Sequence, residues 1–80
     1  MTKIEKKKCI EIMNYGICIA KQSQERYHKS AQYIKEQNET SAYIEEQGAH
    51  QDYGFATGIQ HALASLGFKH EGMKTLFKLL

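Results

Sequence analysis

The chain has 80 residues, of which 41% are hydrophobic and 25% charged, with a net charge of +2 and no proline. This composition is typical of one small globular domain and excludes a disordered segment. No apolar run reaches the roughly 20 residues of a transmembrane helix. The N-terminal lysines are followed by Glu11 and Asn14, where a signal peptide would be apolar. We therefore expect a cytoplasmic protein that does not enter a membrane.

A first helix is predicted over about residues 3–37, because apolar residues recur there at alternating spacings of three and four. Gln24 and Asn38 are polar interruptions of this seam, and Ile12 and Ile19 form a second apolar face beside it. One partner helix cannot cover both faces, so either the C-terminal segment or another subunit must cover the second one. The predicted seam consists of Ile10, Met13, Ile17, Ala20, Gln24, Tyr27, Ala31, Ile34 and Asn38.

A second helix is predicted over about residues 41–66. The polar residues 36–41 favour a turn, and Thr40 or Ser41 is the expected N-cap. The alternative extends the first helix to Gln47 and breaks it at Gly48, and the apolar spacing permits both.

The second helix has a clear end in the sequence Leu66-Gly67-Phe68. It predicts a C-cap with Gly67 in the left-handed conformation and Phe68 folded back on Leu63 or Ala64. A short amphipathic third helix is expected at about 69–80. The fold is therefore predicted to be all-α, a single domain over 1–80 that forms a long antiparallel hairpin plus a short C-terminal helix.

Charge is divided along the chain in a way that suits this hairpin. Residues 1–35 carry eight basic and three acidic side chains, whereas residues 36–66 carry five acidic side chains and no Lys or Arg. Opposite charges on consecutive helices favour antiparallel pairing, within the chain or between subunits.

Small residues form a strip along the second helix: Gly54, Gly58, Ala62 and Ser65. Each glycine costs about 1 kcal/mol relative to alanine in a helix interior. Such a strip lets another helix approach closely, and Gly16 would suit a matching contact. The alternative is that the glycines leave room for a ligand or a partner side chain.

The small size of the chain predicts a homo-oligomer, most simply a dimeric helical bundle. A core of this size stabilises a fold by only a few kcal/mol, so small domains usually need a disulfide, a metal or a partner subunit. Cys9 and Cys18 would lie about 13.5 Å apart along one helix, too far for a disulfide. The predicted interface consists of Ile10, Ile12, Met13, Gly16, Ile17, Ile19, Gly58 and Ala62.

No arrangement of residues predicts catalysis, a metal site or a cofactor. Glu25 and His28 have the Glu-x-x-His spacing of di-iron bundles, but they flank the seam and we interpret them as solvated. His50 and His61 lie about 16 Å apart along a helix and lack further convergent ligands. The lysines of the first helix can be neutralised by the acids of the second, so nucleic-acid binding is not expected.

Residues 53–68, YGFATGIQHALASLGF, resemble a helix ending found in small uncharacterised helical proteins of phages and prophages of Gram-positive bacteria. The resemblance covers about a fifth of the chain. It implies a context in which small proteins bind and neutralise a host protein or a defence signal.

Together these patterns predict a non-enzymatic binding protein, a phage-type antagonist or adaptor that acts on a host protein. One alternative is an oligomer that sequesters a small anionic signal such as a nucleotide, and another is a structural or DNA-associated helical module. Tyrosine combines a large contact area with a hydroxyl group, which suits either kind of partner. The candidate binding residues are Tyr53, Gly54, Gly58, His61 and His50.

Overall fold

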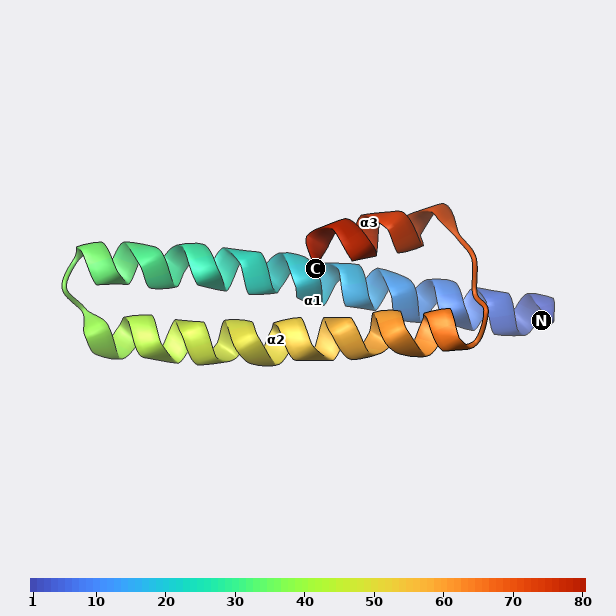
Figure 1. Cartoon of the computed structure of the whole chain (residues 1–80), viewed down its shortest axis with the longest axis horizontal. Helices are drawn as coiled ribbons and strands as arrows, with labels where there is room; N and C mark the ends of the chain where they lie inside the picture. The colour runs from blue at the N-terminus through green and yellow to red at the C-terminus, as the bar shows by residue number, and fades with distance from the viewer.

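The computed structural model describes residues 1–80 as three α-helices: α1 (Lys3–Lys35), α2 (Glu39–Ser65) and α3 (Glu71–Leu79). Helices α1 and α2 form an antiparallel hairpin, and α3 returns along α1 (Figure 1). The molecule measures 52 × 17 × 16 Å. The predicted all-α hairpin with a short C-terminal helix is confirmed. None of the three helices combines the length and the apolar character that crossing a bilayer requires.

The turn between α1 and α2 is a tight reversal in which Gln37 adopts a left-handed conformation with φ +62°. The amide of Gln37 donates to the carbonyl of Ile34, and that of Asn38 donates to the carbonyl of Tyr33. These two bonds define a Schellman motif, which satisfies the last carbonyl groups of α1.

Asn38 caps the start of α2, since its side chain accepts a hydrogen bond from the amide of Ser41 over 3.2 Å. The prediction that Thr40 or Ser41 is the N-cap is therefore wrong. Asparagine is as good a cap as serine, and here it also completes the preceding turn. Gly48 lies within α2 and does not break it.

The end of α2 repeats the same motif with glycine in the left-handed position. Gly67 has φ +74°, and the amide of Phe68 donates to the carbonyl of Leu63 over 3.1 Å. Phe68 is buried in one cluster with Leu63. The predicted cap is confirmed, and it redirects the chain toward α3.

Mainly small residues are buried in the contact between α1 and α2. They recur every seventh residue on both helices, which is the spacing of a coiled-coil seam. The Ser23 hydroxyl donates to the carbonyl of Ala49, and the Ser30 hydroxyl donates to that of Ala42, both over 2.9 Å. Because a serine side chain is short, these bonds require the two backbones to lie close together. The buried set is Cys9, Gly16, Ser23 and Ser30 on α1 and Ala42, Ala49, Ala56 and Leu63 on α2.

The predicted seam of α1 is correct only in part. Met13 and Ala20 are buried as expected, whereas Gln24 and Ala31 are exposed. At every second position of the predicted seam, the buried residue is the one before the predicted residue. The residues buried there are Cys9, Gly16, Ser23 and Ser30. Close backbone approach selects small side chains, and the larger Ile10 and Ile17 lie at the flank of the contact instead.

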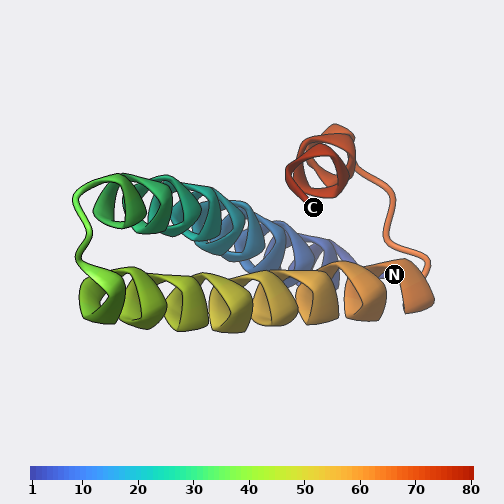
Figure 2. The ribbon, with the colours of Figure 1, turned by 60° about the vertical axis from the view of Figure 1, so that its left-hand side comes forward.

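Helix α3 covers one flank of the hairpin (Figure 2). Leu76 is fully buried in a cluster with Ala20 and Ala56. Gly72 lies against Met13 so closely that a Cβ would overlap the methionine side chain. The C-terminal segment therefore covers part of the apolar surface that α1 presents beside its seam.

Candidate functional site

The flank of the hairpin that α3 does not cover carries exposed apolar side chains from both long helices. Gln24, seven residues after Ile17 on the same face of α1, donates to the carbonyl of Leu79 in α3, and Tyr15 lies about 200° around the helix from Ile17. Residues spaced by three and four share one face of a helix, and contact between Tyr15 and Phe55 aligns the two rows. We call this surface the aromatic face; its residues are Ile12 and Tyr15 of α1 and Phe55, Gly58 and Ala62 of α2.

The centre of the aromatic face is the pair formed by Tyr15 and Phe55. Their ring centroids lie 5.8 Å apart with an interplanar angle of 78°, an edge-to-face contact between α1 and α2. Such a pair is worth about 0.5–1.5 kcal/mol beyond its burial. Yet the two side chains remain 55% and 54% exposed. The pair therefore presents a large apolar area to solvent.

Beside this pair the surface is low, because Gly58 has no side chain. A Cβ built on Gly58 or Gly54 meets nothing within 4 Å. Within the chain, neither glycine makes the close helix contact that their spacing suggests. Gly16 does so instead, since a Cβ there would lie 3.0 Å from Cγ2 of Ile59. The role of Gly58 as a contact between copies stays a prediction.

Five of the predicted interface residues make their contacts within the chain. Met13 and Gly16 are buried against α2, and Ile10, Ile17 and Ile19 pack against the core clusters. Their burial follows from the small residues of α2 and from the return of α3 across α1. The other three, which remain exposed on the aromatic face, are Ile12, Gly58 and Ala62.

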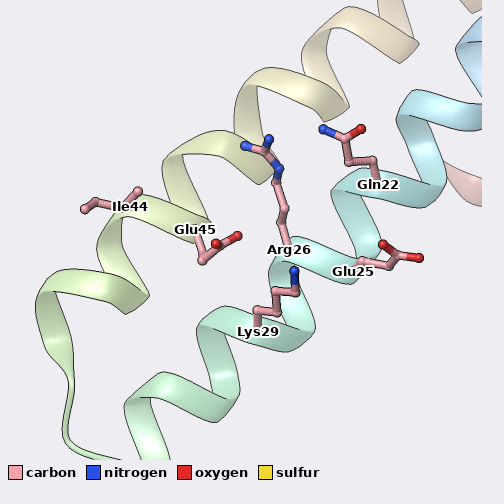
Figure 3. A pocket seen from close by; sticks show the side chains of 6 residues that line it. All are labelled: Gln22, Glu25, Arg26, Lys29, Ile44 and Glu45. Carbon is pink, nitrogen blue, oxygen red and sulfur yellow. The ribbon is translucent and has the colours of Figure 1, made fainter.

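Toward the turn, the same flank holds a polar groove between α1 and α2 (Figure 3). Arg26 Nε lies 3.3 Å from Asp52 Oδ2, an ion pair and not a hydrogen bond, since this oxygen has no hydrogen-bond partner. A Cβ on Gly48 would overlap the Arg26 guanidinium, so glycine at this position lets the arginine cross α2. The groove is lined by Gln22, Glu25, Arg26, Lys29, Ile44 and Glu45. Its two cations and two carboxylates balance, which favours no ion of either sign.

The role of Gly48 was not predicted from the sequence. The division of charge was the only available signal, since it pairs a basic residue of the first helix with an acidic one of the second. The ion pair of Arg26 and Asp52 is an instance of that pairing.

His50 is engaged at both ring nitrogens. Its Nδ1 lies 2.7 Å from the Tyr27 hydroxyl, and its Nε2 lies 3.6 Å from Glu46 Oε1. All three residues are exposed, so the group joins the two helices at the surface. His50 does not line the cavity that holds Tyr53 and His61.

That cavity lies between α2 and the end of α3, on the flank opposite the aromatic face. It brings together Tyr53 and His61, two of the five predicted binding residues, but neither Gly54 nor Gly58. The Tyr53 hydroxyl donates to the carbonyl of Leu80 over 2.9 Å. The cavity is lined by Tyr53, Thr57, Gln60, His61, Phe77 and Leu80.

No three His, Cys, Asp or Glu side chains converge as metal ligands anywhere in the molecule. Both cysteines are free, as their spacing predicted, and Cys9 is buried whereas Cys18 is exposed. In comparisons with known proteins, no family model, curated protein or solved structure matches this chain. Its candidate sites therefore depend on its own residues and their geometry.

Proposed function

We propose that this chain is a non-enzymatic binding module that docks a protein partner on its aromatic face. The observation that carries the proposal is the pair of Tyr15 and Phe55, a rigid aromatic contact that is more than half exposed on a folded helical scaffold. In the phage context that the sequence resemblance implies, a host protein is one candidate partner of this face, and a second copy of the chain is another.

The chemistry of the aromatic face supports this proposal. Tyr and Phe are enriched at protein interfaces because they bury a large area while ordering few rotatable bonds. The face is also continuous over both long helices, and its backbone is held by the close hairpin seam. A partner therefore meets a preformed surface, which reduces the entropy lost on binding.

The test is site-specific photo-crosslinking in cells. A photoreactive phenylalanine analogue replaces Tyr15 in one variant and Phe77 in a control variant, because Phe77 is even more exposed, 68% against 55%, but lies on α3. We expect protein adducts from position 15 and few from position 77. The same or greater yield at position 77, or no adduct at position 15, would contradict the proposal.

A second candidate function is sequestration of a small anionic signal in the cavity beside α3. The observation in its favour is that Tyr53 and His61 line one cavity with Thr57, whose buried hydroxyl has no hydrogen-bond partner. A ligand at a hundredfold excess over Kd would stabilise the fold by about 2.7 kcal/mol. A thermal-shift screen of nucleotides tests this function, and a shift that His61→Ala abolishes is the expected result.

A further inference from the structure

We propose that the occupant of the aromatic face is a second copy of this chain, packed antiparallel about a two-fold axis to form a four-helix bundle. This inference rests on the proposed function, because it needs the aromatic face to be a binding surface. Three features of the molecule support it: the shape of the face, the distribution of charge along the hairpin, and the size of the core.

The aromatic face is complementary to itself. In a two-fold interface each surface meets its own copy, so a projection must be accompanied by a matching depression on the same surface. Tyr15 and Phe55 are more than half exposed on the face, while Gly58 has no side chain and a Cβ built there meets nothing within 4 Å. The rings of each copy can then cover the depression of the other.

The distribution of charge selects the antiparallel orientation. The part of the molecule nearer the N-terminus, residues 1–19 and 54–75, carries six lysines and three glutamates. The part nearer the turn, residues 20–53, carries four basic and six acidic side chains. In an antiparallel pair each positive end lies beside a negative end, whereas a parallel pair places like charges together. Complementary charge of this kind sets orientation more than affinity.

The core of one chain is small, and pairing of two copies through this flank would add to the buried apolar area. Only 13 of the 80 residues are buried, and most of the hairpin seam is glycine, alanine or serine. The whole flank of 52 × 17 Å, of which the aromatic face is the apolar part, offers at most roughly 900 Å², close to the about 800 Å² that each partner buries in a standard interface. A second copy would cover the exposed apolar side chains that the single chain leaves in solvent.

The first experiment measures the mass of the purified protein by sedimentation equilibrium at about 100 μM. We expect the wild-type chain to have twice its 9.2 kDa mass. Phe55→Glu should be monomeric with unchanged helical circular dichroism, since the side chain is exposed within the chain. Phe77→Glu, the same change on α3, should remain a dimer.

A second pair of variants tests the depression at Gly58. Gly58→Ala and Gly58→Leu both improve helix propensity, and both side chains meet open space within one chain. Only leucine fills the depression, so Gly58→Leu should be monomeric and folded while Gly58→Ala should be a dimer. Equal dimerisation of the two variants would overturn the proposed packing.

Orientation is tested by cross-linking Lys8→Cys with Ile44→Cys, each in a Cys18→Ser background, with a short bismaleimide. Lys8 and Ile44 continue the two rows of the aromatic face toward its opposite ends. An antiparallel dimer joins position 8 of one copy to position 44 of the other. A parallel dimer joins each position to itself, and this result would overturn the inference.

The outcomes separate this inference from the proposed function. A monomeric wild-type chain overturns the inference, and the proposed function stands only if position 15 still cross-links to a different protein. A dimer that survives Phe55→Glu but not Phe77→Glu overturns the inference, because association then uses α3 and not the aromatic face, and the adducts at position 15 then decide the proposed function.

Discussion

At the scale of single residues, α1 and α2 end in the same backbone motif, but a different residue type occupies its left-handed position in each. Gln37 and Gly67 both adopt positive φ at the end of a Schellman motif. A residue with a Cβ pays about 1–2 kcal/mol in the left-handed conformation, whereas glycine enters it without steric cost. The turn between α1 and α2 therefore retains strain that the turn after α2 avoids.

Gln37→Gly should raise the free energy of unfolding by about 0.5–1 kcal/mol, because it removes this strain at an exposed position. Urea denaturation followed by circular dichroism measures the change. The matched variant Gly67→Ala should lower the same free energy by about 1 kcal/mol. A destabilised Gln37→Gly would mean that its side chain stabilises the turn more than its backbone strains it.

At the scale of helices, the contact between α1 and α2 depends on the absence of large side chains. Ala49 and Ala56 are fully buried, and the hydroxyl groups of Ser23 and Ser30 reach the backbone of the opposite helix. Each of these hydrogen bonds is worth about 1 kcal/mol, and both require the close approach that the alanines permit. The seam therefore fixes the register of the hairpin as well as its stability.

Ala49→Leu should destabilise the fold by about 3 kcal/mol or more. The larger side chain separates the helices and breaks the hydrogen bond from Ser23. Ala64→Leu, an identical change at an exposed position of the same helix, should alter the free energy of unfolding by less than about 0.5 kcal/mol. Thermal unfolding compares the two, and similar melting temperatures would contradict the close-packed seam.

At the scale of the whole molecule, α3 decides which flank of the hairpin is buried. Leu76 inserts between the two long helices on one side, while Phe77 beside it points to solvent. The side chain of Gln24 donates to the carbonyl of Leu79, which holds the end of α3 against α1. The opposite flank, with Tyr15 and Phe55, is left for a partner.

Leu76→Ala should reduce the free energy of unfolding by about 2–4 kcal/mol, because it leaves a cavity at the junction of all three helices. Phe77→Ala should change it by less than about 0.5 kcal/mol, since that side chain is 68% exposed. Chemical denaturation distinguishes them. Equal effects would show that α3 does not dock on the hairpin in this orientation.

The sequence by itself determined the three helices and the end of the second one. Helical spacing identified three helices, and Leu66-Gly67-Phe68 identified a Schellman cap that the structure confirms. These features depend on interactions between residues three to five apart, so a single sequence contains them in full. The cap at Asn38 was missed because Thr40 and Ser41 are also good caps, and local preference alone cannot rank them.

Only the tertiary structure decided which stripe of each helix is buried. Gly16, Ser23 and Ser30 are not hydrophobic, so the sequence of α1 alone does not mark them as buried. They are buried because they lie opposite Ala42, Ala49 and Ala56 of α2. The candidate site depends on the same kind of long-range choice. Tyr15 and Phe55 are exposed because α3 packs on the other flank, and no pattern within α1 or α2 specifies where a third helix docks.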